Sequence, residues 1–127
     1  MILCWLLRLV GGVCALAILA LFMPHWLMVE MHARLGLGEF PQAPIAEYLA
    51  RSVSALCAFY GGLLIWLASD VRRYGPVIAY QATAIMICAL SGLYLGLSAG
   101  MPLWFVGGDA LACVAFGLPT LWLVAKI

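Results

Sequence analysis

Two charged residues stand inside stretches that are otherwise apolar enough to cross a membrane, and they are the first candidates for chemistry. Arg51 lies about two helical turns into the apolar run that starts near Ile45, and Asp109 lies at a similar depth in the run that starts near Leu103. A charge at the centre of a bilayer costs about 2.5–3.5 kcal/mol even on a lenient insertion scale, so each needs a partner or a function. The equal depths predict an Arg51–Asp109 pair across two helices.

Glu47 offers Arg51 a second partner, because the two residues are spaced i, i+4 in the favourable order and the long arginine stem can reach toward the interface. Two interpretations stay open. In the first, Glu47, Arg51 and Asp109 form a structural charge clamp. In the second, Arg51, Tyr94 and Asp109 line a ligand-binding pocket near the outer leaflet. A proton-handling role for Asp109 is a further alternative, since a short aspartate side chain cannot reach far toward water.

Other clusters of reactive side chains are sparse. His25 and His32 share one face of a short segment with Glu30 nearby, but two histidines without a clear third ligand favour surface side chains over a metal site. No histidine falls within a predicted span, which disfavours a b-type haem. The five cysteines lie in apolar runs without a C-x-x-C pair, as small buried hydrophobes do. The sequence therefore predicts no metal and no cofactor.

Motifs of the common enzyme classes are also absent. The chain has no G-x-S-x-G, no phosphate-binding Walker loop and no H-E-x-x-H. Its net charge of +1, without a lysine and arginine cluster, excludes a nucleic-acid-binding surface. The absence of these motifs predicts a protein that is not an enzyme.

Small multidrug transporters have four spans and a similar length, but they carry a glutamate in the first helix, where this chain has no acidic residue. This difference argues against a proton-coupled exporter of that kind.

The amino-acid composition indicates whether the predicted helices lie in water or in lipid. Of the 127 residues, 68% are hydrophobic and only 9% are charged, and the mean hydropathy is +1.17. A water-soluble chain of this length cannot cover so much apolar surface with so few charges. Most of the chain must therefore face lipid, and residues 1–127 form one domain.

The apolar runs predict an all-α, polytopic membrane protein in which four transmembrane helices form an antiparallel bundle. The spans cover about 2–23, 45–69, 76–98 and 103–124, and a short interfacial helix covers about 25–35. Prolines mark the breaks after the first span, before the second and before the fourth. The start of the first run also fits a signal peptide, but its full-span length favours a membrane helix.

The residues that flank the spans predict how the chain is anchored. Tryptophans near span ends are typical of interface anchors: Trp26, Trp66, Trp104 and Trp122. Basic residues fall on one side if the spans alternate: Arg8, Arg72, Arg73 and Lys126. The positive-inside rule then places both termini in the cytoplasm, although Arg34 and Arg51 on the other side weaken this asymmetry.

Small residues predict close helix packing. One face of the second span carries small or polar residues: Glu47, Arg51, Ser54, Ala58, Gly61 or Gly62, and Ser69. The third span carries a G-x-x-x-G motif at Gly92 and Gly96, continued by Gly100. Such spacing lets helix backbones approach closely in lipid. The motif serves either the bundle itself or a homo-oligomer.

Several segments together resemble a known kind of protein: residues 48–55, the Gly61-Gly62 pair, residues 70–74, residues 35–38 and residues 100–104. From about Met23 onward the chain resembles small, uncharacterised four-span proteins of the bacterial inner membrane that carry a domain of unknown function. The resemblance implies a four-helix bundle in a bacterial inner membrane and implies no activity.

Three functional hypotheses follow. The first is an accessory or scaffold subunit of a membrane assembly, with the lipid bilayer and a membrane-protein partner or a second copy around it. The second is a binder of a lipid, quinone or other apolar small molecule through an outer-leaflet pocket. The third is a small oligomeric transporter that uses Asp109 as its coupling carboxylate.

Overall fold

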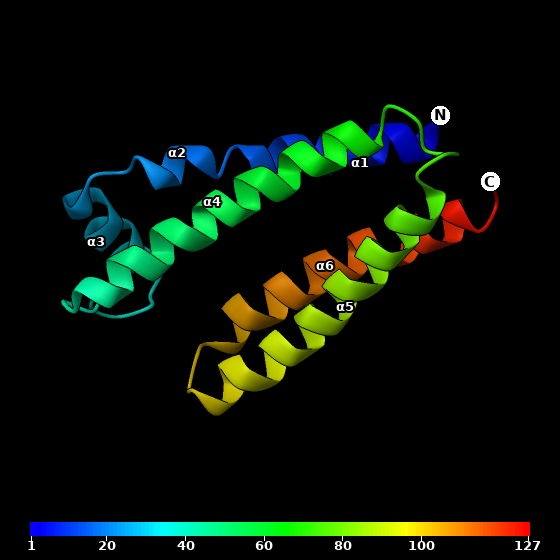
Figure 1. The fold of residues 1–127 in the computed structure, drawn as a ribbon. Coiled ribbons are helices and arrows are strands. Elements are labelled where there is room, and N and C mark those ends of the chain that lie inside the picture. The colour runs from blue at the N-terminus through cyan, green and yellow to red at the C-terminus, as the bar shows by residue number, and fades with distance from the viewer. The chain divides into compact units, whose positions relative to one another are not determined.

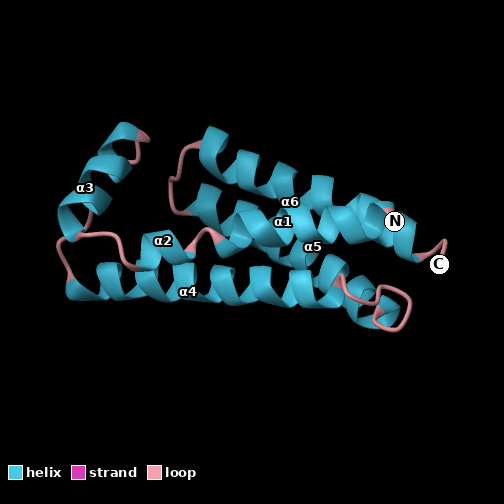
Figure 2. Ribbon diagram, turned by 90° about the horizontal axis from the view of Figure 1, so that it is seen from above, coloured by secondary structure: helices cyan, strands magenta, loops and turns pink.

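The computed structural model describes all 127 residues, and helices are its only regular secondary structure (Figures 1 and 2). The helices are α1 (Ile2–Ala15), α2 (Ile18–Leu21), α3 (His25–Arg34), α4 (Pro44–Leu67), α5 (Gly75–Ser98) and α6 (Leu103–Val124). Four segments are long and apolar enough to cross a membrane: Ile2–Leu21, Pro44–Leu67, Gly75–Ser98 and Leu103–Val124. The predicted all-α fold with four spans and a short helix after the first is confirmed.

The first span differs from its predicted form. It was expected as one helix over residues 2–23, but it is interrupted at Leu16 and Ala17 and ends at Leu21. At the interruption the backbone N–H of Ala17 donates to the carbonyl of Cys14, and that of Leu19 donates to Leu16. Both bonds reach back three residues instead of four, so the helix tightens locally to 3₁₀ geometry.

The chain divides into two compact units. Unit 1 comprises Met1–Leu7 and Leu67–Ile127, and unit 2 comprises Arg8–Trp66. The division falls inside α1 and at the end of α4, so both helices contribute to both units.

Unit 1 contains the α5–α6 hairpin, whose turn is built on a left-handed glycine. Gly100 has φ +79°, a conformation that costs glycine little. The N–H of Met101 donates to the carbonyl of Gly96 at 2.9 Å, which closes the end of α5 as a Schellman motif does. Pro102 then precedes the first residue of α6. The buried residues of unit 1 are Leu3, Leu7, Leu67, Ala68, Gly75, Ile78, Ala82, Ala89, Ala110, Phe116, Gly117 and Thr120.

The hairpin helices meet where a side chain of one fills the space above a glycine of the other. Val106 of α6 lies against Gly96, and Met86 of α5 lies against Gly117. Gly92, the other helical glycine of the predicted G-x-x-x-G motif, has no neighbour within 4 Å of the position of a Cβ. Within unit 1, Gly96 therefore lies at a helix contact and Gly92 does not.

In unit 2, α1 and α4 approach each other at two glycines. A Cβ built on Gly11 would lie 2.8 Å from the carbonyl oxygen of Gly61, and one built on Gly61 would lie 2.5 Å from the backbone nitrogen of Ala15. Backbone therefore touches backbone at this crossing, as small residues permit in membrane helices. Beyond α2, the short helix α3 lies at a steep angle to α4 in Figure 2.

Candidate functional site

The polar residues of unit 2 converge at the end where α2 stops and α4 begins. We call His25, Glu47 and Arg51 the polar cluster. The Nε and Nη2 atoms of Arg51 donate to Oε1 of Glu47 at 3.0 and 2.6 Å. Its Nη1 also donates to the carbonyl of Leu21 at 2.5 Å, and Nη2 donates to the carbonyl of Met23 at 3.0 Å. One guanidinium thus joins a carboxylate and two backbone carbonyls.

The two carbonyls explain why a guanidinium is needed here. Leu21 ends α2, and Pro24 soon afterwards has no N–H to donate. The last carbonyls of a helix lack partners within the helix and carry its partial negative charge. Arg51 supplies both the donors and the positive charge, so it fastens the end of the first span to α4.

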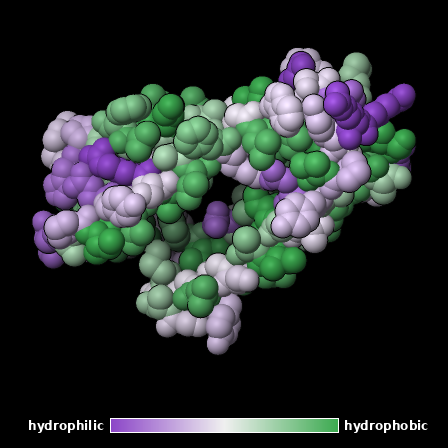
Figure 3. All heavy atoms as spheres, viewed as in Figure 1, coloured by the Kyte–Doolittle hydropathy of each residue, from purple (hydrophilic) through white to green (hydrophobic).

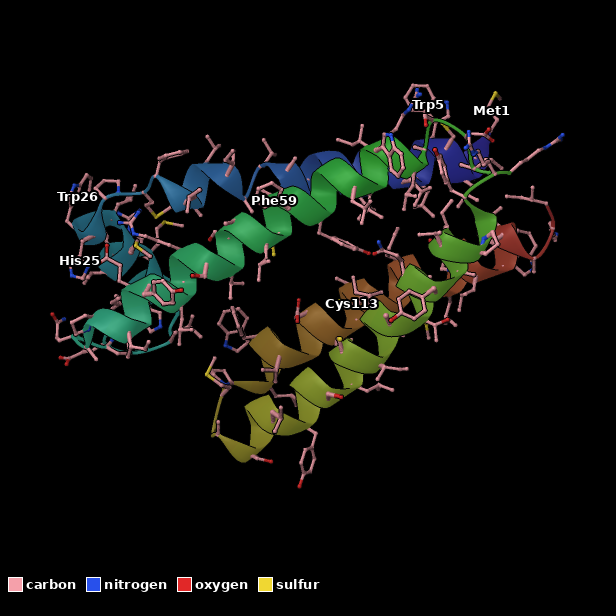
Figure 4. All side chains as sticks on the ribbon, viewed as in Figure 1. Met1, Trp5, His25, Trp26, Phe59 and Cys113 are labelled. Atoms are coloured by element: carbon pink, nitrogen blue, oxygen red, sulfur yellow. The ribbon has the colours of Figure 1, made fainter.

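A histidine and an aromatic ring extend the polar cluster. Nδ1 of His25 lies 3.1 Å from Oε2 of Glu47, the carboxylate oxygen that Arg51 does not contact. Phe40 is buried and meets the rings of His25 and His32 edge-on, at centroid distances of 5.8 and 5.5 Å. Because a carbonyl only accepts, Nδ1 of His32 donates to the carbonyl of Gly38 at 3.1 Å. Figure 4 shows His25 and Trp26 at this end of unit 2.

An apolar groove begins beside the polar cluster and follows one face of α4. We call it the α4 groove. Its volume is about 550 Å³, and its lining residues are all apolar: Ile18, Leu21, Ala55, Ala58, Phe59, Gly62, Leu63 and Trp66. Leu21 belongs to both sites, since its side chain lines the groove while its carbonyl accepts from Arg51. Phe59 lies midway along α4 in Figure 4.

The residues predicted to bind a ligand fall in both units. Arg51 belongs to unit 2 and pairs with Glu47, whereas Tyr94 and Asp109 belong to unit 1. Tyr94 on α5 is 73% exposed, and Asp109 on α6 is exposed as well. The Gly96–Val106 and Met86–Gly117 contacts place them at the same level of the hairpin. The Arg51–Asp109 pair stays a prediction.

Two features were not anticipated from the sequence. One is the donation from Arg51 to the carbonyls of Leu21 and Met23, which only the path of the chain after α2 creates. The other is the α4 groove. The small face of α4 that includes Ala58 and Gly62 was a sequence signal for it, but the large side chains of Phe59 and Trp66 beside that face were not part of the pattern.

The predicted anchors lie close to helix ends and are exposed. The exposed fractions of Trp26, Trp66, Trp104 and Trp122 are between 56% and 65%. Arg72 and Arg73 lie in the connection between α4 and α5, and Lys126 follows α6. In Figure 3 hydrophilic residues gather over α3 and the start of α4 in unit 2, and over the α4–α5 connection in unit 1. Polar ends around apolar helices are typical of membrane spans.

No protein-family model, curated protein or solved structure matches this chain. The resemblance to four-span inner-membrane proteins therefore stays a prediction.

Proposed function

We propose that this multi-pass membrane protein is an accessory or scaffold subunit that binds a transmembrane helix of a partner protein in the α4 groove. The groove lies on a helix that is long and apolar enough to span a membrane, so its occupant meets it within lipid. This groove is the observation that carries the proposal.

The shape of the groove suits a helix. Ala55, Ala58 and Gly62 repeat at intervals of three and four residues along α4 and form a floor of small side chains. Phe59, Leu63 and Trp66 rise beside this floor. In lipid, helices associate where small residues let a neighbouring backbone approach closely, with larger side chains packing around it. From Ala55 to Trp66 the groove follows α4 for about 16 Å, roughly three helical turns.

The contacts between the helices of unit 2 support the same role. The Gly11–Gly61 crossing joins α1 to α4, and the hydrogen bonds of Arg51 join the end of α2 to α4. A preformed surface loses little conformational entropy when a partner binds, so more of the contact energy is retained as affinity.

A photo-crosslinking experiment tests this proposal. A photoreactive amino acid replaces Phe59, which lines the groove and is 79% exposed, and in a matched variant it replaces Val53, which is 57% exposed on the opposite side of α4. We expect the Phe59 variant, irradiated in native membranes, to form a discrete adduct with another polypeptide, and the Val53 variant to form none. Mass spectrometry of the adduct identifies the linked peptide.

Two results would overturn the proposal. An intramolecular link from position 59 to residues 75–124 would show that the chain's own hairpin fills the groove. Equal adducts from positions 53 and 59 would show random collision in the membrane. A link to a second copy of the chain would make the partner a homo-oligomer and retain the helix-binding role.

A second candidate is a binder of a lipid, quinone or similar apolar molecule in the same groove. The observation that favours it is that Arg51, paired with Glu47, donates to the carbonyl of Leu21, a residue of the apolar lining, since ligand sites combine apolar walls with a few polar groups. Mass spectrometry of the detergent-purified protein tests it: retention of one stoichiometric apolar molecule, lost in Gly62→Leu, is the expected result for this alternative.

We further propose that the membrane is a bacterial inner membrane and that both termini face the cytoplasm. The distribution of Arg8, Arg72, Arg73 and Lys126 around alternating spans supports this orientation. Reporter fusions at Lys126 and within residues 36–39 test it, and a cytoplasmic signal from residues 36–39 would reverse the assignment.

A further inference from the structure

Four span ends meet at one end of unit 1, and basic side chains surround two grooves there. The ends are those at Ile2, Leu67, Gly75 and Val124. The first groove, about 460 Å³, is lined by Met1, Ile2, Leu3, Val71, Arg72, Leu123, Lys126 and Ile127. The second, about 550 Å³, is lined by Arg72, Gly75, Pro76, Ala79, Val124 and Ile127. Arg72 and Ile127 line both grooves, so the two adjoin.

The positive charge of this end is not neutralised within the protein. The ion pairs of the structure lie at His25–Glu47, Arg34–Glu30 and Arg51–Glu47, all in unit 2. The one acidic side chain nearby in the sequence, that of Asp70, accepts the backbone N–H of Arg73 at 3.1 Å and lines neither groove. Arg72 and Lys126 are both exposed, and their charges remain available to an anion.

The side chain of Lys126 is held in place while its charge stays free. Its Nζ lies 3.4 Å from the centre of the Trp122 ring, a cation–π contact. Such a contact orients the ammonium group without supplying a counter-charge. Tryptophan also favours the headgroup level of a bilayer, so the ammonium lies at the depth of lipid phosphates.

We propose that this end of unit 1 binds the headgroup of an anionic phospholipid, with the phosphate held by Arg72 and Lys126. A guanidinium matches the phosphate oxygens with two parallel N–H donors, and an ammonium adds a compact charge. The remaining lining, such as Leu3, Val124 and Ile127, is apolar and suits the glycerol backbone and the upper acyl chain. This mixture of apolar walls and cations at the end of the spans favours a lipid over a free phosphate. The site is separate from the α4 groove and does not depend on its function.

Lipid titration of the full-length protein in a neutral detergent, followed by native mass spectrometry, tests the proposal. The probes are dioleoylphosphatidylglycerol, which is anionic, and dioleoylphosphatidylcholine, which has the same chains and no net charge. We expect roughly a 30-fold preference for the anionic lipid, which is the effect of two basic residues at a membrane surface. The preference should disappear in the Arg72→Gln/Lys126→Gln variant and persist in Arg8→Gln/Arg34→Gln, which removes two positive charges from residues that line neither groove.

Three results would overturn the proposal: equal affinity of the wild-type protein for the two lipids, an unchanged preference in Arg72→Gln/Lys126→Gln, and displacement of the bound lipid by inorganic phosphate. The last would identify a free anion as the ligand. If the double variant fails to fold, the lipid preference of the wild-type protein is measured at increasing salt concentration instead. The preference should fall, because salt screens a contact between exposed charges. A preference that does not change with salt would equally refute the site.

Discussion

The two units hold their helices together in different ways. In unit 2, α1 and α4 cross where the backbone of Gly11 meets the backbone of Gly61, and the guanidinium of Arg51 binds the end of the first span. In unit 1, α5 and α6 meet where Val106 and Met86 fill the space above Gly96 and Gly117. Backbone atoms cannot yield to an added methyl group, whereas side chains can move to different extents. The comparison therefore predicts a graded sensitivity to the same Gly→Ala substitution.

The same helices also carry glycines that do not lie at a helix contact. No atom lies within 4 Å of the position of a Cβ on Gly12, Gly62, Gly92 or Gly108. Alanine at these positions adds a methyl group that faces open space and improves the helix propensity by about 0.8–1 kcal/mol. They are matched controls for the glycines that lie at helix contacts.

The largest effect is expected for Gly61→Ala in unit 2. The new Cβ would overlap the carbonyl oxygen of Gly11 and lie 2.5 Å from the nitrogen of Ala15. Because neither backbone atom can rotate away, the helices must separate, and we expect the free energy of unfolding to fall by about 3 kcal/mol or more. Titration with sodium dodecyl sulfate, monitored by tryptophan fluorescence, measures it. The control is Gly62→Ala; if it destabilises the protein equally, the backbone crossing is not the cause.

Replacing Arg51 by glutamine tests the hydrogen bonds that join the end of the first span to α4 in unit 2. The carbonyls of Leu21 and Met23 would lose their donors, and an unsatisfied carbonyl in a partly buried site costs about 1–3 kcal/mol. Amide hydrogen exchange should accelerate around residues 18–27, where α2 ends, and the unfolding temperature should fall. Arg34→Gln is the comparison, since Arg34 is more exposed and pairs only with Glu30. Similar exchange in both variants would contradict a special role for Arg51.

Gly96→Ala in unit 1 should have an intermediate effect. Its Cβ would collide with the Cγ1 methyl group of Val106. Valine is branched at Cβ and has few alternative rotamers in a helix, so part of the strain must pass to the hairpin. We expect a loss of about 1–2 kcal/mol, measured by thermal unfolding followed by circular dichroism. Gly92→Ala, on the same helix, should not lower the stability; a loss there would indicate that α5 uses both glycines.

Gly117→Ala should have the smallest effect of the series. Its Cβ would lie 2.5 Å from Cγ and 2.7 Å from Sδ of Met86. Methionine is unbranched and flexible, so it can adopt another rotamer and fill the space differently. We expect a loss of about 1 kcal/mol or less in the same thermal experiment. A loss as large as that of Gly61→Ala would mean that Met86 cannot move aside, or that the carbonyl oxygen of Ala82, 3.3 Å from the same Cβ, blocks the methyl group.

Much of the fold could be predicted because length and apolarity alone define a membrane span. The predicted bounds of the last span, about 103–124, agree with α6, and those of the third differ from α5 by one residue at its start. Prolines and a left-handed glycine, Gly100, mark the turns locally. The break at Leu16 and Ala17 was missed because neither residue opposes a helix.

The candidate site was less accessible to sequence reasoning. The spacing of Glu47 and Arg51 indicated a local pair, and the structure contains that pair. The carbonyls of Leu21 and Met23, by contrast, are acceptors in every sequence, and only the fold brings them to Arg51. The same holds for Phe40, whose place between His25 and His32 depends on how the chain returns from α3 to α4.

The amino-acid sequence by itself determined that this chain has four apolar helices, roughly which residues they cover and which charges they carry, because these properties depend on residues close together in the chain. Only the tertiary structure decided which member of each glycine pair is used: Gly11 rather than Gly12 and Gly61 rather than Gly62 lie at the crossing. Neighbouring residues of a helix point about 100° apart, so one of two identical glycines faces the partner helix. Which one it is depends on how the helices cross, and that is a property of the pair of helices rather than of either sequence alone.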